Sequence, residues 1–102
     1  MGYIKHNAIV VTGWDDDYLE EAHTKAKEIF NDRLVSEMVK GMINGQSSFF
    51  IAPDGSKEGW ETSQECDDMR EQFTEWLRNK CRRCDYVEVR FGGDDSEAYI
   101  VD

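Results

Sequence analysis

The dipeptide Asn44-Gly45 is the strongest local constraint on the fold of this chain. A two-residue type I′ turn needs a positive φ at both central positions, and asparagine followed by glycine adopts this conformation readily. Residues capable of forming strands flank the dipeptide, from Val35 to Ile43 and from Ser47 to Ala52, although Glu37, Lys40 and Gly41 weaken the first pattern. The sequence therefore predicts a β-hairpin in the middle of the chain.

Periodic patterns before and after this hairpin predict a strand and two helices. Residues 7–12 are typical of a strand, with Ile9 and Val11 on one face. The acidic run from Asp15 to Asp17 suits the positive end of a helix, which we expect to continue to about residue 31. A capping box formed by Thr62 and Glu65 predicts the start of a second helix, which ends near Asn79.

Two further strands are expected near the end of the chain. Residues 86–91 alternate, and we expect Val87, Val89 and Phe91 to point into the core and Tyr86, Glu88 and Arg90 outward. A turn at residues 92–95 precedes a last strand over residues 98–101.

The predicted order β-α-β-β-α-β-β indicates a single domain over residues 1–102 of the α+β class. It suits a ferredoxin-like β-α-β-β-α-β sandwich with an added C-terminal strand, in which two helices lie on one face of an antiparallel sheet. The other face would present a largely apolar set of residues, for which a partner subunit is the simplest cover: Ala8, Val10, Ser48, Phe50, Tyr86, Arg90 and Tyr99.

Composition excludes several classes of protein. The 102 residues include 22 Asp and Glu against 12 Lys and Arg, for a net charge of −10, which argues against binding of duplex nucleic acid through a broad basic surface. A hydrophobic fraction of 39% is too high for a disordered acidic tail. The longest apolar run, residues 8–11, is too short to cross a membrane. The odd number of cysteines argues against a secreted disulfide framework, so we expect a cytoplasmic protein.

No catalytic or metal-binding constellation stands out. Cys81 and Cys84 have the C-x-x-C spacing of a zinc half-site or a redox pair, but Cys66, His6 and His23 are not spaced to complete a zinc site. Two thiols in a loop between helix and strand are the simplest interpretation. No glycine-rich phosphate loop and no Ser-His-Asp pattern is present, so we predict no catalytic residue, no metal and no cofactor.

The scarce cations are more informative, because several lie near aromatic residues. An aromatic face beside a lysine or arginine can stack a base and pair its phosphate. For the two tryptophans involved, burial at a helix start is the competing interpretation. These considerations favour a binding module over an enzyme, with the following candidate residues: Tyr3, Lys5, His6, Trp14, Lys57, Trp60 and Arg90.

Residues 3–12 (YIKHNAIVVT) and 47–60 (SSFFIAPDGSKEGW) resemble a family of small bacteriophage proteins, identified here with the anti-CBASS sponges that counter cyclic-nucleotide immune signalling. The resemblance also takes in the Asp-rich first helix and residues 86–89, and so spans nearly the whole chain. Cys81 and Cys84 match no motif of that family.

The resemblance implies an immune-evasion protein of the host bacterial cytoplasm that is not an enzyme. It would be a homo-oligomer, a dimer or tetramer, that binds and sequesters cyclic di- or oligonucleotides in a pocket between subunits, so that host effectors are not activated. The residues carried over from the matched segments are Lys5, His6, Ser47, Ser48, Lys57 and Trp60, while Tyr3, Trp14 and Arg90 are added on chemical grounds.

A different class of function is also compatible with the sequence. The carboxylates of the two helices could form an acidic surface that mimics DNA and inhibits a host protein, and such binding should collapse with salt. A small enzyme or a housekeeping domain is a third possibility. The acidic residues concerned are Asp15 to Asp17, Glu61, Glu65, Asp68 and Glu75.

Overall fold

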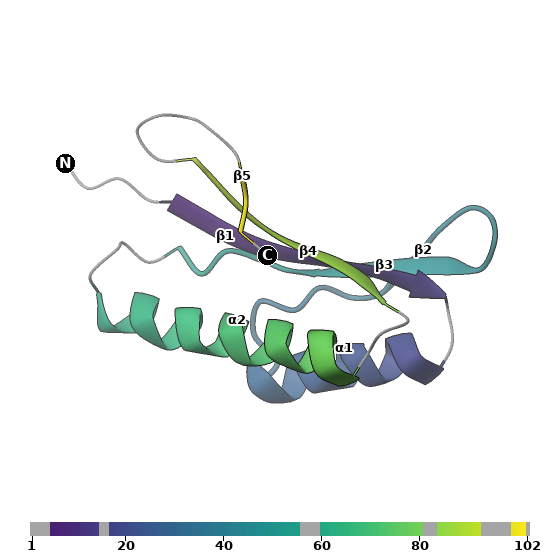
Figure 1. Ribbon diagram of the computed structural model, residues 1–102, viewed down its shortest axis with the longest axis horizontal. Coiled ribbons are helices and arrows are strands. Elements are labelled where there is room, and N and C mark those ends of the chain that lie inside the picture. Colours follow the sequence, from purple (N-terminus) through teal and green to yellow (C-terminus); the bar gives the residue numbers. More distant parts are fainter. Residues whose placement is uncertain (1–4, 15–16, 56–59, 81–83, 93–98, 102) are drawn as a thin grey trace.

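The computed structural model describes residues 5–14, 17–55, 60–80, 84–92 and 99–101 (Figure 1). Strands and helices alternate in the expected order, which confirms the α+β class. The elements are β1 (Lys5–Trp14), α1 (Asp17–Ile29), β2 (Val39–Lys40), β3 (Gln46–Ile51), α2 (Glu61–Lys80), β4 (Asp85–Gly92) and β5 (Tyr99–Ile100).

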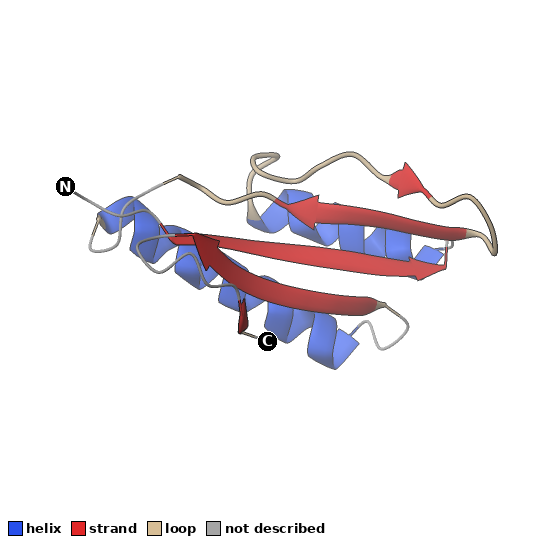
Figure 2. Ribbon diagram, turned by 90° about the horizontal axis from the view of Figure 1, so that it is seen from above, coloured by secondary structure: helices blue, strands red, loops and turns tan. Residues whose placement is uncertain are grey.

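The strands form one antiparallel sheet in the order β2-β3-β1-β4-β5. β1 is the central strand, so Ile9 lies opposite Ile51 of β3 on one side and Glu88 of β4 on the other. Both helices lie against the same face of this sheet, and the other face is left uncovered by the described elements (Figures 1 and 2). Neither described helix has the length and apolar character needed to cross a membrane.

The core fills the space between the sheet and the two helices. Ile9 and Val11 are fully buried on the helix side of β1, as the alternation in the sequence predicts. Phe73 of α2 lies at the centre of an aromatic cluster, with its ring centroid 6.2 Å from that of Phe30 and 6.3 Å from that of Phe49. The apolar stripes of α1 and α2 complete the core through Leu19, Ala22, Ala26 and Leu77.

The predicted hairpin is confirmed, although its first strand is shorter and its connection longer than expected. The Gly41 N–H donates to the Gln46 carbonyl, so residues 42–45 join the two strands. Asn44 and Gly45 both have a φ of 61°, as a type I′ turn requires. β2 is reduced to two residues because the preceding segment does not continue a regular ladder: the Phe50 N–H donates to the Ser36 side-chain oxygen at 2.8 Å, whereas a ladder would use a backbone carbonyl.

The start of α2 differs from the predicted capping box. The Gln64 N–H donates to the Trp60 carbonyl at 3.2 Å, so the helix begins at Glu61 and Trp60 occupies the N-cap position. Thr62 therefore lies inside the first turn, and its assignment as the cap is wrong.

The predicted orientation of β4 is also wrong. Because residues directly opposite in a sheet share a face, the pairing of Val11 with Tyr86 and of Ile9 with Glu88 puts the polar side of β4 toward the helices. Arg90 lies on that side as well, opposite Asn7, while Val87, Val89 and Phe91 occupy the uncovered face. Alternation defines two faces of a strand but does not say which one is covered.

Candidate functional site

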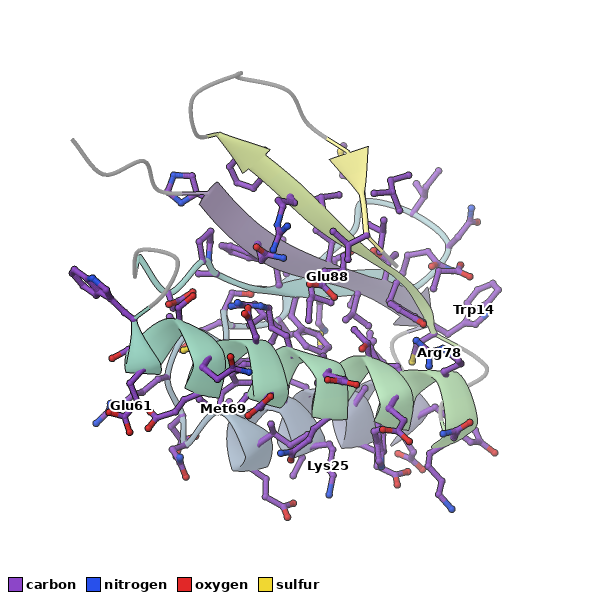
Figure 3. All side chains as sticks on the ribbon, turned by 60° about the vertical axis from the view of Figure 1, so that its left-hand side comes forward. Trp14, Lys25, Glu61, Met69, Arg78 and Glu88 are labelled. Carbon is purple, nitrogen blue, oxygen red and sulfur yellow. The ribbon has the colours of Figure 1, made fainter. Side chains whose placement is uncertain are left out.

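A cleft of about 530 Å³ lies between α2 and the neighbouring strands β1 and β4. We call it the arginine cleft, because three of the chain's six arginines line it. Its lining consists of Asn7, Asp67, Arg70, Glu71, Thr74, Glu75, Arg78, Glu88, Arg90 and Val101. Figure 3 shows Arg78 on the side of α2 that faces β4, and Glu88 between the sheet and that helix.

Arg70 is the most buried charged residue of the cleft, at 3% exposure. One terminal nitrogen of its guanidinium donates to Asp54 Oδ1 at 3.2 Å, and the other forms an ion pair with Asp67. The third nitrogen, Nε, is buried and has no hydrogen-bond partner within the described part of the chain. A buried donor without an acceptor costs about 1–3 kcal/mol. This nitrogen has almost no accessible surface, so a ligand in the cleft could reach it only if the Arg70 side chain moved.

Hydrogen bonds among Asn7, Glu88 and Arg90 connect β1 and β4, the two strands that form the floor of the cleft. Arg90 Nε donates to Asn7 Oδ1 at 3.2 Å, and Asn7 Nδ2 donates to Glu88 Oε2 at 3.1 Å. Asn7 and Glu88 are both buried, whereas Arg90 is half-buried. The chain of bonds satisfies a buried carboxylate and holds the Arg90 guanidinium at the cleft wall.

Charges within the cleft nearly cancel. Three arginines stand among four carboxylates, those of Asp67, Glu71, Glu75 and Glu88, which leaves a local formal charge of −1 in a chain of charge −10. The lining therefore offers donors for an anionic group and acceptors for N–H groups at the same time. A ligand that carries only negative charge would pair with the arginines of this lining and be repelled by its carboxylates.

The other predicted residues on β1 and β3 do not lie in the arginine cleft. His6 is half-buried on the uncovered sheet face, 5.3 Å from the Phe91 ring, and Trp14 is 55% exposed at the end of β1. Ser48 lies on the same face and its hydroxyl is hydrogen-bonded to that of Thr12 at 2.8 Å. Ser47 faces the helices and is buried, and its hydroxyl has no partner within the described residues.

The remaining members of the predicted set are spread along the molecule. Trp60 precedes α2 and is half-exposed, and Figure 3 shows the start of α2 at the opposite end of the molecule from Trp14. Neither tryptophan is a buried residue at a helix start. Lys5 is the first residue of β1, opposite Gly92, while Tyr3 and Lys57 lie outside the described residues. Of the described candidates, Arg90 alone lies in the cleft.

Sequence reasoning missed most of the cleft, although α2 carries a pattern that could have found it. Arg70, Thr74 and Arg78 recur at intervals of four and so share one helix face, beside the apolar stripe that includes Phe73 and Leu77. Asn7 gave a second indication, because it is a polar residue in register with the buried positions of β1.

The cysteines divide into two kinds. Cys66 is free and buried on α2, and burial, followed by the charge of Asp54, raises the pKa of its thiol. Cys84 is disulfide-bonded, so the expectation of a free thiol at that position is wrong. Among the described residues, no cluster of three or more His, Cys, Asp or Glu side chains is arranged to hold a metal ion.

Comparison with protein families, with curated proteins and with solved structures found no match to this chain. The chemistry of the arginine cleft therefore provides the structural basis for the proposed function.

Proposed function

We propose that this protein is a non-enzymatic binding protein that sequesters a cyclic di- or oligonucleotide, and that the arginine cleft receives one nucleotide unit of that ligand. The observation that carries the proposal is the gathering of three of the six arginines around one cleft. A volume of about 530 Å³ falls within the range of roughly 300–1,000 Å³ that is common for small-ligand pockets.

The mixed charge of the lining favours a nucleotide over a simple anion. Guanidinium groups pair with phosphate oxygens through short, charge-assisted hydrogen bonds. Carboxylates accept hydrogen bonds from the N–H groups on base edges. Arg78 and Arg90 would contact phosphate, and Glu88 would accept from the base. Inorganic phosphate offers only its P–OH groups to the four carboxylates, and its negative charge would be repelled by them.

Sequestration requires tight binding and no turnover. Nanomolar affinity corresponds to about −12 kcal/mol. Charge-assisted hydrogen bonds contribute about 1.5–3 kcal/mol each, so several arginine contacts together with base contacts could supply that affinity. In the immune-evasion role implied by the phage resemblance, the protein would act in the host bacterial cytoplasm by depriving an effector of its messenger.

The fold proposed to carry this function is ferredoxin-like. The strand order β2-β3-β1-β4 with β1 at the centre, and the placement of both helices on one face, support that assignment. β5 would then be the added C-terminal strand.

Thermal unfolding of the purified protein against cyclic di- and trinucleotides tests the proposal, with linear dinucleotides and inorganic phosphate as controls. A ligand at about a thousandfold excess over its dissociation constant should add about 4 kcal/mol to the free energy of unfolding. Intact ligand should be recovered after heat denaturation. No stabilisation by any cyclic nucleotide contradicts the proposal, as does recovery of a cleaved ligand.

The location of the site is tested by Arg90→Met, with Arg33→Met as the matched control. Arg33 is an exposed arginine in the segment after α1 and does not line the cleft. Loss of one charge-assisted hydrogen bond should raise the Kd of a nucleotide found in the panel by about 10- to 150-fold. The control should change it less than about threefold. Equal effects of the two substitutions would place the ligand elsewhere.

A further inference from the structure

The sheet face opposite the helices, which we call the open face, is mainly apolar and is interrupted by Thr12, Gln46 and Ser48. Its largest exposed side chains come from all five strands, and each is between 37% and 70% exposed: Val10, Trp14, Val39, Phe50, Phe91 and Ile100. Val10 lies on the central strand directly opposite Phe50, so the two residues form the middle of this surface. A gathering of exposed apolar side chains on one sheet face indicates an interaction surface.

The open face is also almost free of charge. The register places every second residue of the main strands on it: residues 6–14 of β1, 46–50 of β3 and 85–91 of β4, together with Val39 and Ile100. Among these positions Asp85, at the first residue of β4, is the one charged residue. Charged residues make up 33% of the whole chain, so their depletion here is pronounced.

We infer that a second copy of this chain covers the open face, sheet against sheet, in a symmetric dimer. Two molecules of charge −10 repel one another, and the open face is the surface through which they can approach with the least repulsion. The face offers no lysine or arginine among its register positions, so a nucleic acid would find no partner for its phosphates there. A symmetric contact needs a self-complementary patch, and an uncharged apolar sheet is one.

The size of the face fits a weak dimer. The strands β1, β2, β3, β4 and β5 contain 10, 2, 6, 8 and 2 residues. At about 3.4 Å per residue and about 4.8 Å between strands, they give a footprint of roughly 450 Å² per subunit. Two copies would then bury about 900 Å² in total, which is below the roughly 1,200–2,000 Å² of stable interfaces and typical of weak, transient association. Packed sheets lie about 10 Å apart, which leaves room for Val10 and Phe50 to interdigitate with their symmetry mates.

Dimerisation and ligand binding use opposite sides of the sheet. The arginine cleft lies on the helix side, so a dimer formed through the open face leaves two clefts accessible. The inference can therefore be tested without any nucleotide, and its failure would leave the proposed function standing.

Analytical ultracentrifugation of the full chain, with Phe50→Glu as the test variant and Met42→Glu as its matched control, decides the question. Met42 is an apolar residue in the hairpin loop with 99% exposure, and it lies outside the open face, so its substitution adds the same charge elsewhere. The wild type and Met42→Glu should form dimers with similar dissociation constants in the micromolar range. Phe50→Glu should weaken association at least about a hundredfold, because each dimer would bury two like charges.

A second variant and a salt series keep the test decisive if Phe50→Glu fails to fold. Val10→Thr preserves the β-branched shape and should weaken the dimer about tenfold through its buried hydroxyl. Raising NaCl from about 0.05 M to about 0.5 M should tighten the wild-type dimer, since it screens repulsion between acidic molecules. A protein that stays monomeric up to about 200 μM, a concentration at which a micromolar dimer is nearly complete, overturns the inference. Association that neither open-face variant weakens overturns it too.

Discussion

The side chain of Asn7, on the central strand, is hydrogen-bonded to both charged groups on the floor of the arginine cleft. Replacing Asn7 by alanine therefore tests how much these two hydrogen bonds contribute to the stability of the protein. The side chain donates to Glu88 at 3.1 Å and accepts from Arg90 at 3.2 Å. Asn7→Ala removes both bonds at once. The carboxylate of Glu88, which is 8% exposed, loses the donor from Asn7, whereas the half-buried Arg90 can turn toward water.

The size of the effect follows from this asymmetry. A hydrogen bond to a charged partner contributes about 1.5–3 kcal/mol, and we take the lower value for Arg90 because water replaces part of the bond. The buried Glu88 is expected to account for about 2 kcal/mol more. Asn7→Ala should therefore lower the free energy of unfolding by about 3–4 kcal/mol, equivalent to about 12–30 °C in Tm for a domain of this size.

Urea unfolding followed by circular dichroism measures this loss directly. Asn79→Ala is the matched control, because the same side chain is removed from an exposed position near the end of α2, and it should change stability by less than about 0.5 kcal/mol. Adding Glu88→Gln to Asn7→Ala should restore about half of the loss, since it removes the buried charge that has lost its partner. A loss below about 1 kcal/mol in Asn7→Ala, or no recovery in the double variant, refutes the reasoning.

Two further predictions concern the core and the free thiol. Phe73→Ala empties the centre of the aromatic cluster and should cost about 3–5 kcal/mol, which chemical denaturation measures; a cost below about 1 kcal/mol would mean that Phe30 and Phe49 close the cavity. Because burial, and then the charge of Asp54, raise the pKa of the Cys66 thiol, the stabilisation linked to the protonated thiol is fully present below about pH 9 and is lost as the pH rises further. Unfolding free energies measured from pH 7 upward should therefore fall more steeply above about pH 9 in the wild type than in Cys66→Ala, and parallel curves would contradict this.

Local sequence patterns predicted the parts of the fold that depend on local conformation. The Asn44-Gly45 turn requires a backbone conformation that few dipeptides adopt, and both residues have it. The apolar spacing in α1 and α2 likewise identified helices that bury Leu19 and Phe73. These features depend on neighbours within a few residues, which a sequence displays directly.

The orientation of β4 could not be predicted in the same way. Val87, Val89 and Phe91 form the more apolar side of the strand, and the usual preference would bury them against the helices. The register with β1 reverses this preference, because Glu88 and Arg90 pair with Asn7 across the sheet. Such a contact joins residues more than 80 positions apart, so the sequence around either residue does not indicate it.

The candidate site was harder to predict for the same reason. Arg90 was identified from its isolation in an apolar strand, but its partners come from β1 and from one face of α2. The residues of the resembling segments that the structure describes, among them His6, Ser47 and Ser48, are distributed over both faces of the sheet. Proximity in sequence was a poor guide to which side of the sheet a residue occupies.

The central position of β1 also determines when the molecule can fold. β1 is synthesised before both of its neighbours in the sheet, which are residues 46–51 and 85–92. Closing loops of this length is entropically costly and slows folding relative to helical proteins of the same size. During synthesis on the ribosome, one edge of β1 therefore stays unpaired until β4 has been synthesised. A nascent chain stalled after α2 would expose this strand edge, which could then pair with another molecule.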